Sequence, residues 1–422
     1  MGFSMFGAQS SPIAIDFGTS SVKLLQLSLG DRPTVVAAAE LAIPDAIRQD
    51  KQARLDFYAR KLPGLLRKAA FKGRRAICSV PSAQTFIQHM QITAPDGAAR
   101  EEMVHAQLSS QTGCLPQSMV IRTVDVAEVI REGQTRSELI CFAIPRAVVM
   151  RHVELLNRCK IQVIGAHSEL LAMVRSFAQL YADGADESRT TLYVDLGWGS
   201  TKVAISHGNE LVFARCIQVG GRHFDQCIAD EMQLDIAEAR AHRLSHDVFS
   251  SAAVETPGET VGVEAESGPA LLRAGAEQAV REGGDSFDHA GLGSTADQGV
   301  GIESHDRMAE AALGEDPASD QGHDGVCELL DAITDELSMC LRYHHSVFRE
   351  RSVDRMIFLG GEARQKGLCQ HVAKALRLPA HLGDPLASVA AEGSLNTPGV
   401  KLDEPQPGWA VACGLSTSPA EL

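Results

Sequence analysis

Residues 191–205 read TLYVDLGWGSTKVAI and contain the pattern that decides the fold. An apolar run ends at Asp195, a turn of Gly-Trp-Gly-Ser-Thr follows, and a second apolar run starts at Lys202. Apolar segments on either side of a short, glycine-containing turn predict a β-hairpin. The turn of this hairpin offers backbone N–H groups and hydroxyls, with a carboxylate beside them.

The chain contains the same pattern a second time, near its start. Residues 13–27 read IAIDFGTSSVKLLQL, with Asp16 before a turn of Phe-Gly-Thr-Ser-Ser. Both copies share Asp-x-Gly, a hydroxyl-rich turn, and a lysine seven positions after the aspartate. This repeat predicts two related halves that each contribute one loop to a shared cleft.

Loops of this composition are suited to phosphate binding. Glycine lets the main chain approach phosphate oxygens closely, and N–H groups and hydroxyls can then bind those oxygens. A neighbouring carboxylate can hold Mg²⁺, usually through water, and a lysine adds a positive charge. The alternative interpretation is an ordinary hairpin with a polar turn, and the presence of two matched copies disfavours it.

We therefore expect Asp16 and Asp195 to be the metal-side carboxylates, acting through water, and Lys23 to counter the phosphate charge. The residues expected to cradle the phosphates are those of the two turns: Gly18, Thr19, Ser20, Ser21, Gly197, Trp198, Gly199, Ser200 and Thr201.

A third stretch, residues 355–367, reads RMIFLGGEARQKG, an apolar strand that runs into Gly360-Gly361 and then a helix. The two hairpins and this turn resemble the phosphate-1, phosphate-2 and adenosine motifs of the actin/Hsp70/sugar-kinase superfamily. The resemblance implies an actin-like α/β fold of duplicated domains, with ATP and Mg²⁺ as ligands. It also implies a set of residues that border the nucleoside: Gly360, Gly361, Glu362, Gly220 and Gly221.

Composition excludes several other classes of protein. The 422 residues carry a net charge of -15, which disfavours a nucleic-acid partner because phosphodiesters need a basic surface. The ten cysteines include no C-x-x-C and are scattered through apolar segments, which favours reduced thiols in the cytosol. We find neither a secretory signal at the start nor an apolar run of the roughly 20 residues that a membrane span needs.

The order of predicted elements suggests a domain division. Residues 82–159 read as strand, helix, strand, strand and helix, a small α/β module inserted in the first half. Residues 249–324 are rich in Gly, Ser, Ala, Asp and Glu with little periodicity, and we expect a disordered acidic insert there. The resulting boundaries are 12–81, 160–190 and 405–422 for the first half, and 191–404, interrupted by the insert, for the second.

This order of elements resembles the PilM/competence protein A family of type IV pilus assembly and, more loosely, the FtsA cell-division family. Local stretches carry the likeness: SVPSAQTFIQHMQI at the entry to the module, VAISHGNELVFARCIQVGGRHFD in the second half, and LPAHLGDP near its end. The likeness covers most of residues 12–246 and 326–416.

The family resemblance implies a cytoplasmic ATP-binding scaffold on the inner face of the membrane. It would hold the N-terminal tail of a single-span, PilN-like inner-membrane protein in a groove beside the inserted module. ATP would act as a conformational ligand with at most slow turnover. The resemblance also implies Glu169 as a catalytic candidate that positions a water or Mg²⁺. A first-turn glutamate favoured by the helix dipole is the alternative interpretation of Glu169.

Two residues depart from the family pattern. Trp198 stands in the second phosphate turn, where we expect a small or polar residue, so its ring either stacks on the ligand or crowds it. Glu362 follows Gly360-Gly361 where another small residue is expected. We expect both changes to affect the rate of hydrolysis more than binding.

Two other functions remain open from the sequence alone. A small-molecule kinase of the same superfamily would need a catalytic aspartate base and a substrate domain larger than the inserted module, and neither is apparent. An FtsA-like division or filament protein would end in a basic amphipathic helix, whereas this chain ends STSPAEL. The sequence does not distinguish pilus, competence and type II secretion systems, nor does it indicate whether the protein polymerises.

Overall fold

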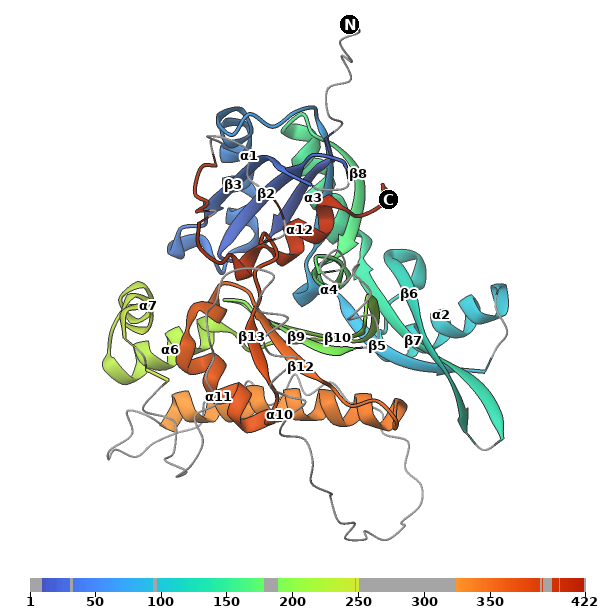
Figure 1. Cartoon of the computed structure of the whole chain (residues 1–422). Helices are drawn as coiled ribbons and strands as arrows, with labels where there is room; N and C mark the ends of the chain where they lie inside the picture. Colours follow the sequence, from blue (N-terminus) through green and yellow to red (C-terminus); the bar gives the residue numbers. More distant parts are fainter. Residues whose placement is uncertain are drawn as a thin grey trace, which may run out of the picture.

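The computed structural model of the 422-residue chain contains two five-stranded sheets, one above the other, and a smaller three-stranded sheet at one side (Figure 1). The structure describes the following residues: 10–30, 33–93, 97–131, 133–177, 189–246, 248–249, 324–387, 389, 397–401 and 403–420. The expected insert at 249–324 therefore lies outside the described residues, except for its two ends.

The first sheet has the strand order β3-β2-β1-β4-β8. Its strands are β1 (Ile13–Phe17), β2 (Ser21–Leu27), β3 (Val35–Ala42), β4 (Arg75–Val80) and β8 (Gln162–Ser168). The first three strands form an antiparallel meander, and β4 and β8 then add parallel to β1. The predicted first hairpin is thus confirmed as β1–β2.

The second sheet repeats this arrangement in the order β11-β10-β9-β12-β13. Its strands are β9 (Thr190–Leu196), β10 (Thr201–His207), β11 (Glu210–Ile217), β12 (Arg355–Leu359) and β13 (Ala380–Leu382). Again three antiparallel strands are followed by two parallel ones. The same order and directions in both sheets confirm the predicted duplication.

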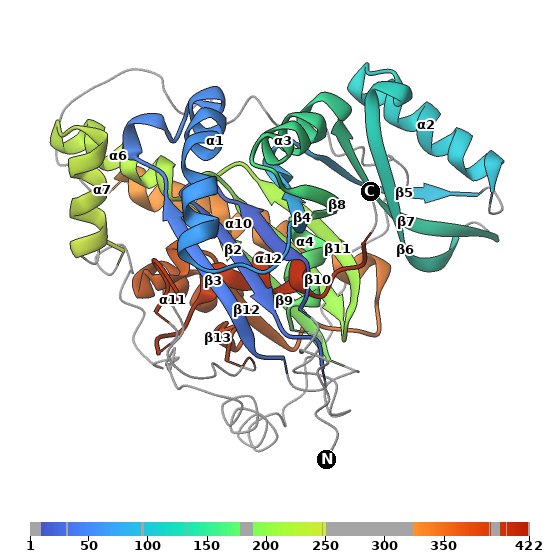
Figure 2. The same cartoon turned by 90° about the horizontal axis from the view of Figure 1, so that it is seen from above.

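Helices cover both faces of each sheet (Figures 1 and 2). The helices α1 (Lys51–Lys68) and α3 (Arg146–Arg158) cover the outer face of the first sheet, while α4 (Glu169–Arg175) and α12 (Ala410–Ser416) lie between the sheets. The outer face of the second sheet is covered by α6 (Gly221–Met232), α7 (Ile236–Ser245), α10 (Asp324–Val347) and α11 (Lys366–Leu376).

The helix α1 shows how local sequence sets these elements. Asp50 caps its start, because the Asp50 carboxylate accepts hydrogen bonds from the backbone N–H groups of Gln52 and Ala53. Its apolar stripe packs on the first sheet through Phe57, Tyr58, Leu62 and Leu66. Proline tends to kink or break a helix, but α1 continues through Pro63 as one helix of 18 residues.

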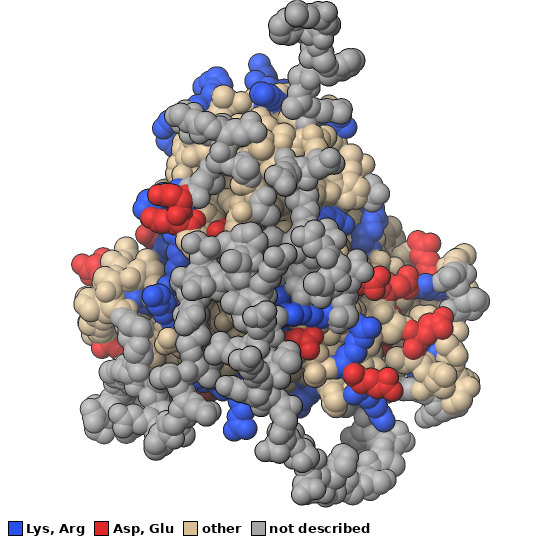
Figure 3. Space-filling model, in the orientation of Figure 1, with Lys and Arg blue, Asp and Glu red and all other residues tan. Residues whose placement is uncertain are grey.

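The inserted segment forms a sheet of order β5-β7-β6, at the right of Figure 1. Its elements are β5 (Phe86–Ile92), α2 (Ala98–Thr112), β6 (Met119–Arg131) and β7 (Gln134–Pro145). In the described part of the chain, β6 pairs on one side only, so its other side is an edge. Over this segment, acidic and basic side chains are intermixed on the face shown in Figure 3.

The inserted segment packs firmly against the second half. Ile140 and Phe142 of β7 belong to the same core cluster as Tyr193 and Ile357 of the second sheet. The Glu138 carboxylate is fully buried there; it accepts a hydrogen bond from the Tyr343 hydroxyl of α10 and lies 3.5 Å from His89 Nδ1. His89 is thus part of this contact between the inserted segment and the second half.

Two further features concern the chain as a whole. Phe249, the first residue of the expected insert, is buried and packs edge-on against Phe224, with 5.1 Å between ring centroids. Phe249 therefore belongs to the packed core, whereas residues 250–323 of the expected insert lie outside the described residues. Among the residues that the structure describes, no helix combines the length and apolar character needed to cross a membrane.

Candidate functional site

The second phosphate turn, between β9 and β10, is held closed by its own backbone and by the start of α6. The Gly197 N–H donates to the Ser200 carbonyl at 3.1 Å. The N–H groups of Gly221 and Arg222 donate to the carbonyls of Gly197 and Trp198 at 3.0 and 2.7 Å. Gly220 and Gly221 therefore support this turn from behind, at the N-terminus of α6.

The first phosphate turn, between β1 and β2, has the same close approach of backbone to backbone. A Cβ atom on Gly18 would lie 2.7 Å from the Ser21 carbonyl oxygen, and one on Gly197 would lie 2.7 Å from that of Ser200. Different groups support the first turn: the Tyr58 hydroxyl donates to the Gly18 carbonyl at 3.1 Å, and the Ile43 N–H donates to that of Ser20 at 2.9 Å.

The two turns meet across the space between the halves. A Cβ atom on Gly199 would lie only 3.1 Å from Thr19 Cγ2 and 3.2 Å from Thr19 Oγ1. Residues 180 positions apart in the chain thus face each other, one from each hairpin. The two turns predicted to contribute to a shared cleft therefore lie next to each other.

Three carboxylates converge beside the turns: Asp16 at the end of β1, Asp195 near the end of β9, and Glu169 at the start of α4. All three are at most 6% exposed. The Ser79 hydroxyl donates to Asp16 Oδ1 at 3.2 Å, and the Ser82 N–H donates to Glu169 Oε2 at 2.9 Å. Burial raises the pKa of Asp16 to about 6; Lys23 lowers this pKa and Glu169 raises it further.

A buried lysine lies among these carboxylates. The Lys202 ammonium is 3.2 Å from Asp195 Oδ2 and 4.0 Å from Glu169 Oε2. Burial alone would lower the pKa of Lys202, but Asp195, Glu169 and Asp16 together raise it above its usual value. Lys202 therefore stays charged and balances part of the negative charge of the cluster.

Lys23, which we predicted as the phosphate lysine, lies on the other side of the site. Its ammonium is 3.8 Å from Glu40 of β3, which also accepts a hydrogen bond from the Ser21 hydroxyl at 2.6 Å. A Cβ atom on Gly408 would lie 3.6 Å from Lys23 Nζ and 3.8 Å from the Gly360 carbonyl carbon. Lys23 thus extends along the first hairpin toward the turn after β12.

The turn after β12 is the one predicted to border a nucleoside. Gly360 has a φ of +89°, and a Cβ atom there would lie 2.2 Å from the Leu196 carbonyl oxygen and 2.5 Å from Asp195 Oδ1. Only glycine fits this position without strain. The Cβ position of Gly361, in contrast, has no atom within 4 Å. The turn therefore packs one glycine against the carboxylate site and presents the next to open space.

A buried polar network connects this turn to the second phosphate turn. The Trp198 indole N–H donates to Asp225 Oδ2 at 2.7 Å, and Arg243 donates to Asp225 at 2.7 Å and to Glu362 at 2.6 Å. Asp225 and Arg243 are fully buried. The carboxylates of Glu362 and Asp225 raise the pKa of Arg243 against the opposing effect of burial.

This network decides what the two unexpected residues do. The Trp198 ring is buried: its indole N–H is bonded to Asp225 of α6, and the Arg48 guanidinium of the first half lies 5.4 Å from the ring centroid. The Glu362 carboxylate reaches α6, where a Cβ atom on Gly221 would lie 2.6 Å from its Cδ. Both side chains join parts of the second half together.

The arrangement fits a nucleotide better than a directly bound metal. Arg243 Nη2 is a buried donor with no hydrogen-bond partner within the described residues, and it lies beside the turns predicted to border the nucleoside. For a metal, no group of three His, Cys, Asp or Glu side chains in the described ranges is placed to hold an ion. Lys202 lies among the carboxylates instead, so direct coordination of Mg²⁺ by all three does not fit.

Most residues singled out from the sequence gather at this site, but two hydroxyls are engaged elsewhere. Thr201 donates to the Val219 carbonyl at 2.8 Å, and Ser21 donates to Glu40. The sequence analysis missed several contributors, namely Ser79, Lys202, Asp225, Arg243, Arg48 and Tyr58. Only Lys202 carried a usable signal, because it repeats the position of Lys23 in the first hairpin.

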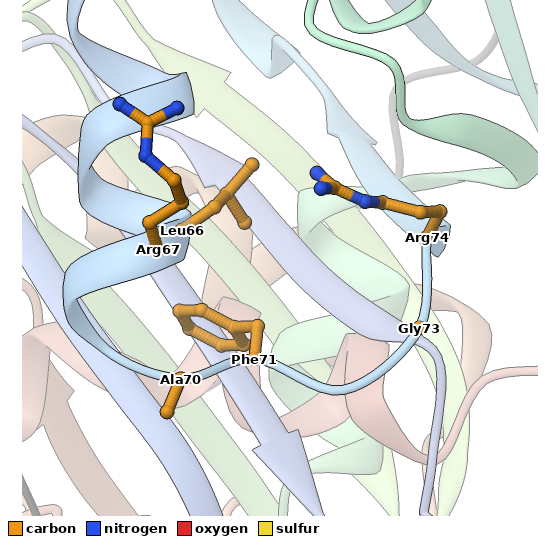
Figure 4. Close-up of a pocket in the computed structure, with 6 residues that line it drawn as sticks. All are labelled: Leu66, Arg67, Ala70, Phe71, Gly73 and Arg74. Atoms are coloured by element: carbon orange, nitrogen blue, oxygen red, sulfur yellow. The ribbon is translucent and has the colours of Figure 1, made fainter.

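A hollow is found at the end of α1, lined by residues other than those of the candidate site (Figure 4). It has a volume of about 480 Å³ and is lined by Leu66, Arg67, Ala70, Phe71, Gly73 and Arg74. None of these residues belongs to the motifs described above, and the hollow is not part of the candidate site.

Comparisons with known proteins place the chain in a family. The model of the family described as type IV pilus assembly protein PilM matches residues 14–254. A solved structure of a PilM-PilN type IV pilus biogenesis complex has a TM-score of 0.66 and 17% identity, covering 96% of this chain and 97% of that chain.

Other similarities are more local or more distant. The cell shape-determining protein MreB of Escherichia coli (strain K12) is 32% identical over 79 residues, which are 18% of this chain and 22% of MreB, so the chain spans about a fifth of that relative. MreB5 of Spiroplasma citri bound to ADP has a TM-score of 0.42 and 12% identity, covering 95% of this chain and 94% of that chain. Because the PilM family model matches more than half of its residues, this chain belongs to the type IV pilus assembly protein PilM family, and its fold is that of an actin-like ATPase.

Proposed function

We propose that the chain binds ATP between its two phosphate turns. The observation that supports this proposal is the close approach of Thr19 and Gly199, which brings two matched glycine- and hydroxyl-containing turns, one from each half, next to each other. When bound, ATP would supply phosphate oxygens for the N–H groups of both turns. Its nucleoside would lie over Gly361, where the structure leaves room, and near the unpartnered Nη2 of Arg243.

Mg²⁺ would accompany the nucleotide through water. Asp16 and Asp195 would hold water ligands of the ion, since Mg²⁺ keeps several of its waters in most protein sites. Glu169 would position a water near the phosphates. Its carboxylate already accepts a hydrogen bond from Ser82 N–H and lies 4.0 Å from Lys202. These engagements hold the Glu169 carboxylate in place, and they favour ATP as a conformational ligand with slow turnover.

We further propose a cytoplasmic scaffold in type IV pilus assembly, attached to the inner membrane through a protein partner. The partner would be the N-terminal tail of a single-span, PilN-like protein, in line with the similarity to a PilM-PilN complex. The tail would bind beside the inserted segment, residues 82–159. Among the described residues, β6 is the last strand of its sheet, and extended peptides can add to such an edge strand.

ATP binding is tested by replacing Gly361 with valine. The new side chain would enter the space proposed for the nucleoside, while no atom of the protein lies within 4 Å of its Cβ. We expect the Gly361→Val variant to keep its melting temperature and to bind ATP at least about tenfold more weakly, a loss of about 1.4 kcal/mol. Isothermal titration calorimetry measures the affinity, and a thermal melt monitors the fold.

The matched control is Gly64→Val. Gly64 is exposed on α1, away from the cleft, and its Cβ position is also free of atoms within 4 Å. This variant should bind ATP as the unmodified chain does. Equal ATP affinity in the Gly361→Val and Gly64→Val variants, or no binding by the folded unmodified chain, would contradict the proposal.

A further inference from the structure

Lys202 and Lys23 occupy equivalent positions in the two hairpins. In the first hairpin Lys23 pairs with Asp16 across the β1–β2 ladder, and in the second Lys202 pairs with Asp195 across the β9–β10 ladder. Each lysine is the seventh residue after its aspartate. By symmetry, the two ammonium groups would be expected to play the same part.

The third strand of each sheet breaks this symmetry. In the first sheet the residue paired with Lys23 on β3 is Glu40, and the Lys23 ammonium is 3.8 Å from the Glu40 carboxylate. In the second sheet the residue paired with Lys202 on β11 is Cys216. Burial raises the pKa of the Cys216 thiol to about 11, so at neutral pH it offers no negative charge. Lys202 therefore faces a neutral residue on β11, the third strand, where Lys23 faces a carboxylate on β3.

Lys202 is directed instead to the carboxylates between the halves. Its ammonium lies 3.2 Å from Asp195 and 4.0 Å from Glu169, and its side chain is 14% exposed. A Cβ atom on Gly197 would lie 3.9 Å from Lys202 Nζ, which puts the ammonium directly beside the second phosphate turn. A positive charge thus already lies where carboxylates and phosphates would otherwise share a divalent cation.

We propose that Lys202 is a built-in counter-cation of the Asp16, Glu169 and Asp195 carboxylates and replaces a directly coordinated metal ion. An ammonium donates up to three hydrogen bonds and needs no ordered coordination shell, whereas Mg²⁺ requires near-octahedral oxygen ligands. The Lys202 ammonium lies at Asp195 Oδ2, so a cation bound through this oxygen would lie beside a positive charge that repels it. The carboxylate cluster is consequently neutralised in part without any metal.

Two consequences follow for binding. Without nucleotide, the chain should have little affinity for a divalent cation at this cluster. With nucleotide, and here the inference rests on the proposed ATP site, the cluster would hold Mg²⁺ only through its waters, so the affinity for ATP should depend only slightly on Mg²⁺. Removing the Lys202 charge should raise the affinity of the cluster for a divalent cation and make the affinity for ATP depend strongly on Mg²⁺. The reason is that three carboxylates would then lie together with only Lys23 nearby.

The test compares the full-length chain with its Lys202→Met and Lys23→Met variants. Mn²⁺ is the probe, since it takes oxygen ligands and its binding is read directly by electron paramagnetic resonance without nucleotide. We expect the Lys202→Met variant to bind one Mn²⁺ at least about tenfold more tightly than the unmodified chain. The Lys23→Met variant should show a clearly smaller gain, because the Lys23 ammonium acts on Asp16 but also lies 3.8 Å from Glu40. Tight single-site Mn²⁺ binding by the unmodified chain, or equal Mn²⁺ affinity in all three proteins, would overturn the inference.

A second variant covers the case in which Lys202→Met does not fold. Lys202→Arg keeps the charge and should bind Mn²⁺ as weakly as the unmodified chain, whereas Lys202→Gln, which keeps a hydrogen-bond donor without the charge, should bind it more tightly. Equal affinities in these two variants would also overturn the inference.

The nucleotide arm compares the ATP dissociation constant in Mg²⁺ with that in EDTA. The two dissociation constants should agree within about threefold for the unmodified chain and differ by at least about tenfold for the Lys202→Gln variant. A large ratio in the unmodified chain would contradict the role of Lys202. If the unmodified chain binds no ATP at all, the proposed function fails, and the Mn²⁺ measurement still decides the inference.

Discussion

The two hairpins β1–β2 and β9–β10 have nearly the same backbone and quite different surroundings. In both, a glycine after the aspartate packs against a serine carbonyl at the same distance, and a lysine faces the aspartate across the ladder. Around the first turn the supports are single hydrogen bonds, from Tyr58 and Ile43. Around the second turn the support is a buried network of Trp198, Asp225, Arg243 and Glu362.

This difference shows that the repeated motif determines the backbone of the turn, whereas the rest of each half determines which charged groups lie beside it. Glu40 on β3 binds the lysine of the first hairpin, and the neutral Cys216 leaves the lysine of the second to the carboxylates. The halves are thus alike in the backbone of the turn. They differ in how they balance charge.

The largest expected effect comes from the network behind the second turn. Replacing Arg243 with methionine would leave the fully buried Asp225 and the nearly buried Glu362 without their common partner. We expect a loss of about 3–5 kcal/mol in the free energy of unfolding, the usual result of removing one partner from a buried ion pair. Urea denaturation measures it.

The control for this prediction is Arg240→Met on the same helix. Arg240 pairs with Asp45 of the first half, but that pair is partly exposed, at 18% and 39% of the two side chains. Its loss should cost less than about 1 kcal/mol. If the two variants were equally stable, the network would not be the main support of the second turn.

The next effect concerns charge at the first turn. Asp16 has a pKa of about 6 in the folded chain against its usual 3.8, so its ionised form disfavours folding. The stability that protonated Asp16 contributes is present below pH 3.8 and is lost as the pH rises through 6. The difference between these values corresponds to at most about 3 kcal/mol.

The variant Asp16→Asn should therefore gain stability relative to the unmodified chain between pH 4 and pH 8. Urea unfolding across this range measures the change, with the exposed Asp56→Asn of α1 as a control that should show none. A stability difference between Asp16→Asn and the unmodified chain that stays constant over the whole range would be inconsistent with the raised pKa.

A smaller effect is expected in the inserted segment, which is carried by the first half alone. Four apolar side chains of residues 82–159 are exposed: Met103, Leu115, Ile130 and, on α3, Met150, at 41, 64, 77 and 44%. If the PilN-like tail binds here, replacing at least one of them with glutamate should weaken binding about tenfold, or 1.4 kcal/mol. Fluorescence titration with the labelled tail peptide measures the affinity.

Met232→Glu is the matched control for this scan, because Met232 is 47% exposed on α6 of the second half. Deleting residues 82–159 would be a poorer test, since Ile140 and Phe142 share a core with the second sheet. Unchanged tail binding in all four variants, or an equal loss in Met232→Glu, would move the docking site elsewhere.

The smallest effect is expected at the support of the first turn. Tyr58→Phe removes only the hydrogen bond to the Gly18 carbonyl and should cost about 1 kcal/mol. Chemical denaturation of this variant beside Arg243→Met compares the two supports directly. A Tyr58→Phe loss as large as the Arg243→Met loss would remove the contrast between the hairpins.

The sequence was sufficient for the parts of the fold that depend on local patterns. Asp-x-Gly turns between apolar runs predicted both hairpins, and their repetition predicted two halves. It was insufficient where partners come from distant segments. Arg243 meets Asp225 and Glu362, the latter 119 residues away, and no local pattern announces such a pairing.

The charge at the site shows the same limit. Lys202 has the same local sequence position as Lys23, and only the strand register shows that Cys216 stands where Glu40 stands in the first half. Trp198 was read from the sequence as a ring in the turn, but its direction depends on Asp225 of α6. The direction of a side chain at such a repeated turn is set by its contacts with distant segments of the chain.

The central claim is that one nucleotide joins both hairpin turns, and hydrogen–deuterium exchange of the full-length chain with and without ATP tests it most directly. The account predicts that ATP slows exchange in both turns together, at residues 17–21 and 196–201, with further protection near Gly361. Protection of one turn alone, or no change in either while the protein is saturated with ATP, would contradict it.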